Sequence, residues 1–113
     1  MLTLKCIFSF LGSYDYRYED PMYGQNYFYK NPGSSVDGYE VPVYWALQSS
    51  WYTFQGREPD MTHYTWWRHY TQMMWKGSRL VGVGCARTTN GTNIVVANFY
   101  PKGNIPGLYA INV

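Results

Sequence analysis

Two runs of β-branched and small residues, joined by a short turn, constrain the fold of this chain more than any other feature. The runs are residues 79–87 and 93–100, and residues 88–92 (TTNGT) lie between them. Asn-Gly between two such runs predicts a β-hairpin, because both residues tolerate a positive φ. The sequence therefore predicts an antiparallel pair of strands.

Two further features bear on the sheet. Gly82 and Gly84 leave one face of the first strand without side chains, so we expect another part of the molecule to pack closely against it. Residues 27–29 (YFY) lie within a turn-rich stretch and predict a short additional strand.

Two helices are predicted from apolar residues that recur every three or four positions. The first covers residues 42–54, with Pro42 in its first turn and Gly56 after its end. Its expected apolar face consists of Val43, Ala46, Leu47, Ser50, Trp51 and Phe54. The second covers residues 62–76, with Thr62 or Thr65 as its cap and Gly77 after its end. Its recurring apolar positions are Trp66, Trp67, Tyr70, Met73 and Met74.

Length and charge limit the class of protein. A chain of 113 residues that is 46% apolar and 14% charged suits one globular domain and is too apolar for a disordered chain. Residues 1–60 carry a net charge of −3, and residues 61–113 carry +5 with no acidic residue. Either the halves neutralise each other across one fold, or a basic face meets anionic lipid or another polyanion. The lack of a Lys/Arg run argues against a nucleic-acid partner.

The two cysteines, Cys6 and Cys85, are too few for a disulfide-rich scaffold. Residues 2–12 form an apolar stretch with one Lys and no clear cleavage site. This stretch suits a poor signal peptide, a buried first strand or a misplaced start of the chain, and the sequence does not separate these alternatives.

The sequence offers few residues for catalysis or metal binding. His63 and His69 are six residues apart, which does not place them on one face of a helix, and no HxxxH, HExxH, CxxC or GxSxG motif occurs. Asn90-Gly91-Thr92 is a candidate glycosylation site as well as a turn. The aromatic residues around Trp66-Trp67 and in residues 14–29 either fill a core or line a ligand groove.

Two longer stretches resemble the signatures of the CAP superfamily, which groups cysteine-rich secretory proteins, venom antigen 5 and plant pathogenesis-related proteins. They are residues 69–76 (HYTQMMWK) and 95–104 (VVANFYPKGN). Residues 23–26 (YGQN) resemble the family's YGEN motif, and residues 51–54 (WYTF) resemble its WYxE motif. The matching signature positions are Tyr70, Thr71, Gln72, Trp75, Asn98, Tyr100, Pro101, Gly103 and Asn104. The chain's end resembles the Golgi-associated plant pathogenesis-related subgroup.

The resemblance implies an α+β fold, a three-layer α-β-α sandwich that lacks the family's first helix. It implies a CAP domain over residues 20–113, preceded by a poorly assigned segment, residues 1–19. The family has a cleft with two His and two Glu that binds a divalent metal in some members. Here His69 matches the second His, whereas Gln25 and Phe54 stand in place of the Glu residues and residues 14–18 contain no His. Because one of these four ligands is left, we expect no metal, no cofactor and no catalytic residue.

The expected function is therefore binding without catalysis. The resemblance implies a lipid or sterol, an anionic membrane surface or a protein partner as the ligand, and no nucleic acid. The alternatives are a metal-dependent hydrolase that uses His69 and a truncated product without function. The resemblance implies an extracellular, secreted protein, with association with the Golgi membrane or its cytoplasmic face as the alternative. Ala97 stands where secreted members have a cysteine, which favours the cysteine-poor, Golgi-associated branch.

Overall fold

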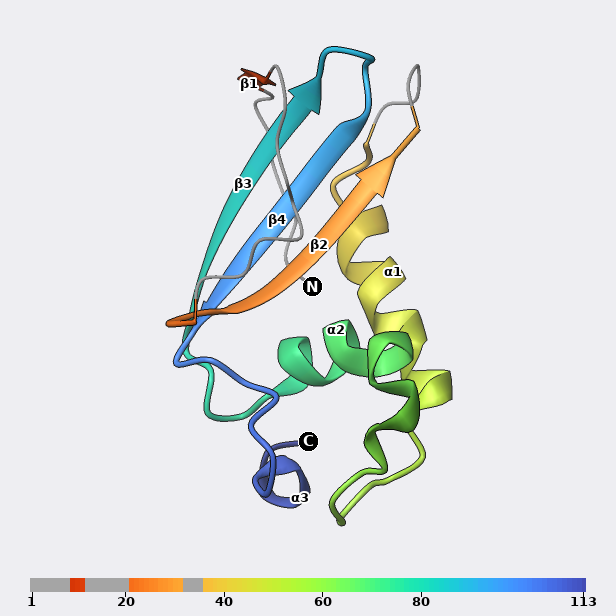
Figure 1. Ribbon diagram of the computed structural model, residues 1–113, viewed down its shortest axis with the longest axis vertical. Helices are drawn as coiled ribbons and strands as arrows, with labels where there is room; N and C mark the ends of the chain where they lie inside the picture. Colours follow the sequence, from red (N-terminus) through yellow and green to blue (C-terminus); the bar gives the residue numbers. More distant parts are fainter. Residues whose placement is uncertain (1–8, 12–20, 32–35) are drawn as a thin grey trace.

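The computed structural model describes residues 9–11, 21–31 and 36–113. A four-stranded sheet has the order β1-β3-β4-β2 (Figure 1). β4 pairs antiparallel with β2 on one side and with β3 on the other, and β1 pairs parallel with β3. The strands are β1 (Ser9–Leu11), β2 (Gly24–Lys30), β3 (Leu80–Thr88) and β4 (Asn93–Tyr100). The α-helices are α1 (Glu40–Leu47), α2 (Tyr64–Met74) and α3 (Tyr109–Asn112). Two 3-10 helices are η1 (Gln48–Trp51) and η2 (Met61–His63).

The predicted hairpin is confirmed, and so is the strand predicted at residues 27–29, which forms part of β2. β3 and β4 pair without interruption from Leu80 opposite Tyr100 to Arg87 opposite Asn93. In the turn only Gly91 takes a positive φ, of 88°, so the glycine alone provides the left-handed conformation that closes the hairpin.

The close packing predicted over the two glycines of β3 is wrong. A Cβ atom added to Gly82 or Gly84 would meet no atom of the described residues within 4 Å. The register explains why, since it puts Val83 on the same face as Ala97, which packs against α1. The glycines therefore lie on the opposite face of β3, where they are exposed.

The first predicted helix is shorter than expected and buries a different face. α1 ends at Leu47, and η1 continues the chain as a 3-10 turn. Val41 and Trp45 are buried, whereas Val43, Leu47 and Trp51 are exposed. Because α1 is apolar on nearly all sides, its periodicity does not identify the core face. The Trp45 indole, whose Nε1 donates to the carbonyl of Tyr27 at 3.1 Å, decides the orientation.

The second predicted helix is confirmed over its central part, but its cap is different. Neither Thr62 nor Thr65 caps α2, whose N-cap residue His63 makes no side-chain cap hydrogen bond. Asp60 instead caps η2, and its side chain accepts a hydrogen bond from the N–H of Thr62 at 2.8 Å. Trp67 is buried as predicted, whereas Trp66 and Met74 are about half exposed. The helix instead buries polar side chains toward the sheet and the segment after β4, namely His69, Thr71 and Gln72.

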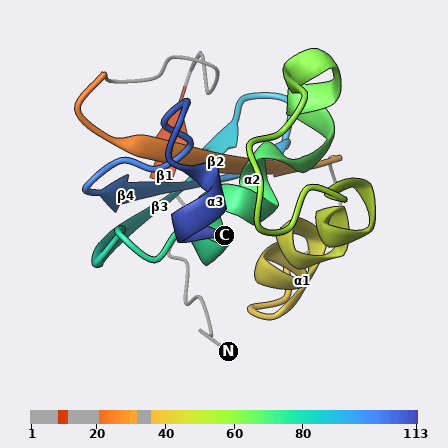
Figure 2. The ribbon, with the colours of Figure 1, turned by 90° about the horizontal axis from the view of Figure 1, so that it is seen from below.

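Two separate cores hold these elements together. The first lies between α1 and β4 and contains Val41, Trp45, Val95 and Ala97. The second is aromatic and contains Tyr52, Trp67, Trp75 and Tyr109, which join α2 to α3. Its rings meet edge to face, with centroids 5.0 Å apart for Trp75 and Tyr109, and each such pair adds about 1 kcal/mol beyond area burial. Seen from below, α1 lies outside the layer of strands (Figure 2).

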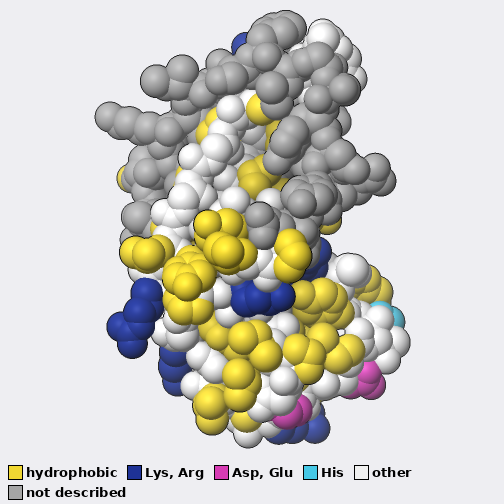
Figure 3. Space-filling model, turned by 60° about the vertical axis from the view of Figure 1, so that its left-hand side comes forward, with side chains coloured by type: hydrophobic (Ala, Val, Ile, Leu, Met, Phe, Trp, Pro, Cys, Tyr) yellow, Lys and Arg dark blue, Asp and Glu magenta, His cyan; other side chains and the backbone are white. Residues whose placement is uncertain are grey.

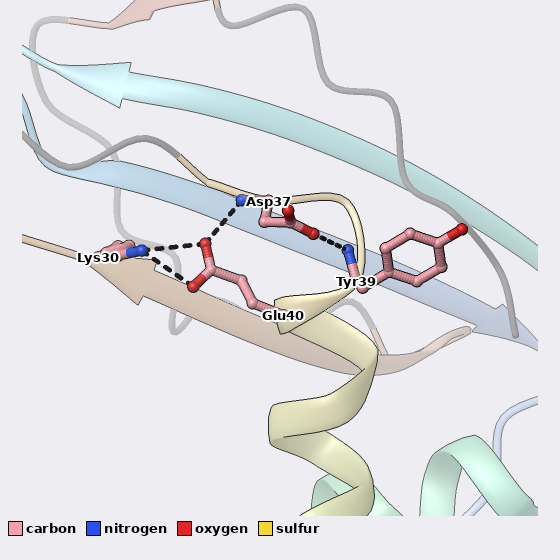
Figure 4. A network of polar contacts seen from close by, with 4 residues as sticks. All are labelled: Lys30, Asp37, Tyr39 and Glu40. Atoms are coloured by element: carbon pink, nitrogen blue, oxygen red, sulfur yellow. Dashed lines mark hydrogen bonds and ion pairs between the residues drawn. The ribbon is translucent and has the colours of Figure 1, made fainter.

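A short polar network fixes the start of α1 against the sheet (Figure 4). The Lys30 ammonium at the end of β2 lies 2.9 Å from Glu40 Oε2. Glu40 Oε1 also accepts the N–H of Asp37 at 2.8 Å, and Asp37 Oδ1 accepts the N–H of Tyr39 at 2.7 Å. Because Glu40 lies in the first turn, its charge also suits the positive end of the helix dipole.

These elements confirm the α+β class. α1 covers the face of the sheet that carries Val95 and Ala97, whereas Gly82 and Gly84 on the other face of β3 are exposed. Cys85 in β3 is disulfide-bonded. In residues 9–11, 21–31 and 36–113, no helix is long and apolar enough to cross a membrane. The division of the chain at residue 20 stays a prediction, and residues 1–8 and 12–19 lie outside the described residues.

Candidate functional site

His69 lies at the junction of α2, α1 and β2, and its side chain is buried. Its ring packs edge to face against Tyr27 with centroids 4.7 Å apart and lies 6.2 Å from the Trp45 ring. The His69 carbonyl accepts a hydrogen bond from Asn26 Nδ2 at 2.9 Å. The imidazole is therefore held by aromatic side chains from two other elements.

Gln48, at the start of η1, is the polar neighbour of His69. Its Oε1 accepts the backbone N–H groups of His69 at 3.1 Å and of Tyr70 at 3.2 Å. Its Nε2 lies 3.4 Å from His69 Nδ1. Since Oε1 already faces two N–H donors, the amide NH₂ faces the ring, and Nδ1 is the acceptor. The proton of the neutral imidazole then resides on Nε2, which is buried and has no hydrogen-bond partner among the described residues.

Burial, together with the smaller effect of the nearby Arg68 charge, lowers the pKa of His69 to about 3. The ring is therefore neutral throughout the physiological pH range. With its proton on Nε2, the ring presents an N–H and not a lone pair toward the enclosed side.

The three expected positions of the metal tetrad do not come together. Phe54 packs in the aromatic core, 5.6 Å from the Tyr52 ring, with the Arg57 guanidinium over its face. Gln25 Nε2 donates to Asn98 Oδ1 at 3.1 Å, and its Oε1 is buried without a partner in the part of the chain that the structure describes. Gln25 lines a cavity of about 190 Å³ beside Arg68 and Lys102, whereas His69 lines a different one.

Gln48 is the residue that the sequence analysis missed, and a signal for it exists. Trp45 and Gln48 are separated by two residues, the spacing of Trp and Glu in the WYxE motif. The pair Trp51 and Phe54 has the same spacing, and the sequence analysis matched this pair to the WYxE motif. The structure places Gln48, and not Phe54, beside His69, so an amide rather than a carboxylate or a phenyl ring stands there.

An apolar groove adjoins His69 on the outer side of α1. It has a volume of about 490 Å³ and is lined by Tyr44, Leu47, Gln48, Trp51, Thr65 and Trp66. A second, more polar cavity of about 440 Å³ shares Tyr44, Gln48 and Thr65 with it and extends to Tyr27, Lys30 and His69. The two cavities adjoin each other at these shared residues, and we refer to them together as the depression, with exposed aromatic side chains at one end and polar side chains at the other.

The aromatic end of this depression is exposed to solvent. Leu47 is 67% exposed, Trp51 58% and Trp66 49%. The Trp51 and Trp66 rings meet at 5.3 Å, and His63 stacks on Trp66 at 4.0 Å with nearly parallel planes. Such a cluster of exposed large apolar side chains is unusual on a monomer and indicates a binding surface.

The residues of the two longer signatures mainly hold the fold together. Thr71 Oγ1 donates to Asn104 Oδ1 at 2.6 Å, and Asn104 Nδ2 donates to the carbonyl of Arg68 at 2.9 Å. Gln72 Oε1 accepts the N–H of Gly103 at 2.9 Å. These bonds tie α2 to the segment after β4. Trp75 is buried, Tyr70 borders the aromatic core, Tyr100 is exposed, and the Tyr100–Pro101 bond is cis.

Asn90, the candidate glycosylation site, is exposed in the hairpin turn. Its Oδ1 accepts hydrogen bonds from the Thr88 hydroxyl and from the Thr92 N–H. In the part of the chain that the structure describes, no group of three His, Cys, Asp or Glu residues is placed to hold a metal ion.

An antiparallel sheet covered by an apolar helix, with a buried histidine where the next helix meets the edge strand, defines an α+β domain of the CAP class. The model of the cysteine-rich secretory protein family, CAP, matches residues 4–99. The chain belongs to this family, and the resemblance read from its sequence is confirmed.

Known proteins agree with this assignment. The human "Golgi-associated plant pathogenesis-related protein 1" is 37% identical over 78 residues, which cover 67% of this chain and 48% of that protein. "Pathogenesis-related protein 1C" of Nicotiana tabacum is 51% identical over 41 residues, covering 34% of this chain and 23% of that protein. The solved structure described as "Structure of BmVAL-1" matches with a TM-score of 0.57 and 21% identity, over 75% of this chain and 47% of that chain. This chain thus spans about half the length of such relatives.

Proposed function

We propose that this chain is a non-catalytic binding module of the CAP family, and that the depression between α1 and α2 holds an amphipathic ligand, a lipid or a sterol. The observation that carries the proposal is that an exposed aromatic groove adjoins a polar cavity and shares three lining residues with it. An apolar ligand body would lie on Leu47, Trp51 and Trp66. Its polar end would reach Gln48 and Tyr27.

Charge and side-chain chemistry support binding rather than catalysis. The neighbour of His69 is an amide, and the carboxylates that general acid–base chemistry needs are absent from the residues that line the described depression. The depression also contains Lys30, which is paired with Glu40 and gives the polar end a mixed character. An uncharged hydroxyl of a sterol or a lipid headgroup therefore suits this end.

Co-sedimentation with vesicles tests the proposal. Vesicles of neutral phospholipid, of neutral phospholipid with sterol, and of neutral with acidic phospholipid would be compared. Leu47→Asp places a charge in the groove, whereas Ile111→Asp in α3 is the matched control, since the two side chains are 67% and 69% exposed. We expect Leu47→Asp to lose roughly tenfold in binding and Ile111→Asp to match the wild type. Equal and negligible pelleting with every vesicle would overturn the proposal.

The second candidate, a metal-dependent hydrolase that uses His69, has less support. The buried and neutral imidazole is a possible single ligand, but Gln48 and Tyr27 around it bind divalent cations poorly. A truncated product without function is the third candidate, and a cooperative thermal melt of the purified chain would argue against it.

The compartment of the protein is likewise a proposal. The disulfide of Cys85 favours an oxidising compartment, consistent with secretion. The human relative is named as Golgi-associated, which favours the alternative of a Golgi membrane location. Protection of Cys85 from alkylation in protein taken from its native source would support the oxidising compartment.

A further inference from the structure

Independently of the groove beside His69, we propose that Asn90 carries an N-linked glycan, which the chain acquires in the secretory pathway. The proposal rests on the oxidising compartment proposed above and not on ligand binding by the groove. Asn90 is followed by Gly91 and Thr92, and no other asparagine in the sequence stands two residues before a Ser or Thr. The chain therefore offers a single acceptor for this modification.

The acceptor lies at the tip of the β3–β4 hairpin. The Gly91 N–H donates to the Thr88 carbonyl at 2.9 Å, and the Thr88 N–H donates to the Thr92 carbonyl at 3.0 Å, so residues 89–91 form the loop. Asn90 is exposed in this loop. The turn lies at the upper end of the sheet, whereas α2 and α3 lie toward the opposite end (Figure 1). A modifying enzyme can therefore reach the Asn90 side chain from solvent.

Only the oxygen end of the Asn90 amide takes part in the turn. Oδ1 accepts hydrogen bonds from the Thr88 hydroxyl and from the Thr92 N–H, the latter at 3.2 Å. The nitrogen Nδ2, to which the sugar would be attached, makes no hydrogen bond to a described residue. Since the oxygen faces two donors, the NH₂ group points away from the turn. Attachment of a sugar to Nδ2 therefore removes no hydrogen bond of the hairpin.

The surroundings of the turn suit a bulky, hydrated group. The loop consists of Thr89, Asn90 and Gly91 and contains no large apolar side chain. Most of the hydrophobic side chains on the face shown in Figure 3 gather in its lower half, away from the end of the molecule that carries the turn. A glycan at Asn90 would thus be attached to a polar surface and would cover no exposed apolar cluster.

The disulfide of Cys85 supports passage through the compartment in which this modification takes place. Cys85 lies in β3, five residues before Asn90, and it is disulfide-bonded. Disulfides form and persist in the oxidising compartments of the secretory pathway. Proteins that pass through these compartments are also the ones whose exposed sequons receive N-linked glycans. One pathway would therefore account for both Cys85 and Asn90.

The transfer requires a donor, which is an oligosaccharide joined through pyrophosphate to a polyisoprenoid lipid, and the transferase of the pathway. The bond between C1 of the first sugar and the pyrophosphate oxygen breaks, and its electron pair stays on that oxygen. A bond forms between C1 and Asn90 Nδ2, and the proton that Nδ2 loses passes by way of the transferase to the departing lipid pyrophosphate. Asn90 supplies the attacking nitrogen, and nothing is oxidised or reduced.

Mass spectrometry of the full chain taken from its native source tests the proposal. A peptide N-glycosidase used in heavy-oxygen water converts a glycosylated asparagine to an aspartate that carries one heavy oxygen. We expect this label at position 90 in most of the protein. Spontaneous deamidation of the Asn-Gly pair before treatment leaves ordinary oxygen instead, so the label separates the two reactions. Alkylation of free thiols in the same sample reports on Cys85, which we expect to be protected.

Matched variants separate the sequon from the turn. They are expressed with the wild-type chain behind an added secretory signal in cultured cells. Thr92→Ala removes the sequon but keeps the hydrogen bonds of the turn, because the Thr92 hydroxyl bonds to no described residue. We expect Thr92→Ala to lose the glycan completely, Thr92→Ser to keep it, and Thr89→Ala to match the wild type.

The outcomes that overturn the proposal are distinct. An unmodified Asn90 in protein whose Cys85 is protected would overturn it and leave the oxidising compartment intact. An unmodified Asn90 together with an alkylated Cys85 would contradict both. Aspartate with ordinary oxygen at position 90 would identify deamidation as the modification instead. A glycan that persists in Thr92→Ala would exclude Asn90 as its acceptor. None of these results bears on vesicle binding by the groove.

Discussion

The side chain of Gln48 contacts both the backbone and the ring of His69, although the two residues are 21 positions apart in the sequence. The side-chain oxygen Oε1 of Gln48 accepts a hydrogen bond from the backbone N–H of His69 at 3.1 Å, while its side-chain nitrogen Nε2 lies 3.4 Å from His69 Nδ1. The first contact orients the amide, and the orientation then sets which ring nitrogen carries the proton. The chemistry of the only buried histidine in the described part of the chain thus depends on a residue from a different helix.

Replacing Gln48 by Glu should raise the pKa of His69. A carboxylate next to Nδ1 favours the charged imidazolium, which burial now disfavours, so the pKa should move from about 3 toward the ordinary value of 6.5. The measurement is an NMR titration of the ring signals. Gln55→Glu, in an exposed turn, is the control and should leave His69 unchanged. An unshifted pKa in Gln48→Glu would contradict the geometry of this pair.

Stability should fall in mild acid because His69 is buried in its neutral form. Its folded-state pKa of about 3 lies below the unfolded value of 6.5, so the unfolded state binds the proton more readily. The stabilising contribution is complete above pH 6.5 and is lost as the pH falls toward 3, with a slope of up to about 1.4 kcal/mol per pH unit. Urea denaturation between pH 7 and 5 should show a flatter dependence for His69→Gln than for the wild type. Parallel curves would show that His69 does not carry the effect.

Gly103 should tolerate no side chain. A Cβ there would lie 2.8 Å from Gln72 Nε2 and 2.8 Å from Trp75 Cγ, so Gly103→Ala should destabilise the fold by about 1–3 kcal/mol. Gly82→Ala is the matched control, since its Cβ would meet no atom of the described residues within 4 Å, and it should have little effect. Thermal melts of both variants make the comparison. Equal melting temperatures of the two variants would mean that Gly103 is packed less closely against Gln72 and Trp75 than the structure shows.

Zinc should not bind tightly at His69. The ring offers one nitrogen, and its neighbours Gln48 and Tyr27 are poor ligands for a borderline metal, which needs several strong donors together. Isothermal titration calorimetry with zinc should therefore show no micromolar site. Micromolar binding that disappears in His69→Ala would reverse this conclusion and revive the hydrolase candidate.

Local sequence patterns predicted some elements well. The Asn-Gly turn and its flanking runs predicted the hairpin because turn chemistry acts over a few residues. The second helix was predicted for the same reason, but its cap was not. Asp60 lies before the residues whose apolar spacing predicts the helix. The side-chain cap belongs to η2, the 3-10 turn between Asp60 and α2, so it falls ahead of that spacing.

Other features depended on contacts between distant residues. Periodicity along α1 did not identify its buried face, since apolar residues occur all around the helix and the Trp45 contact with β2 decided the matter. The glycines of β3 suggested close packing, yet the face on which they lie follows from the register with β4. The candidate site also depended on such contacts. Two pairs, Trp45 with Gln48 and Trp51 with Phe54, have the spacing of the WYxE motif. Only the packing of η1 on α2 shows that Gln48 is the residue beside His69.

By itself, the sequence determined the family, the α+β class, the hairpin and the replacement of acidic groups by neutral ones. These are properties of residue identity and of neighbours along the chain. The tertiary structure decided which neutral group stands beside His69, which apolar side chains remain exposed and which face of α1 is buried. Those features arise from the pairing of segments far apart in the chain, where burial and register, rather than local propensity, set the free energy.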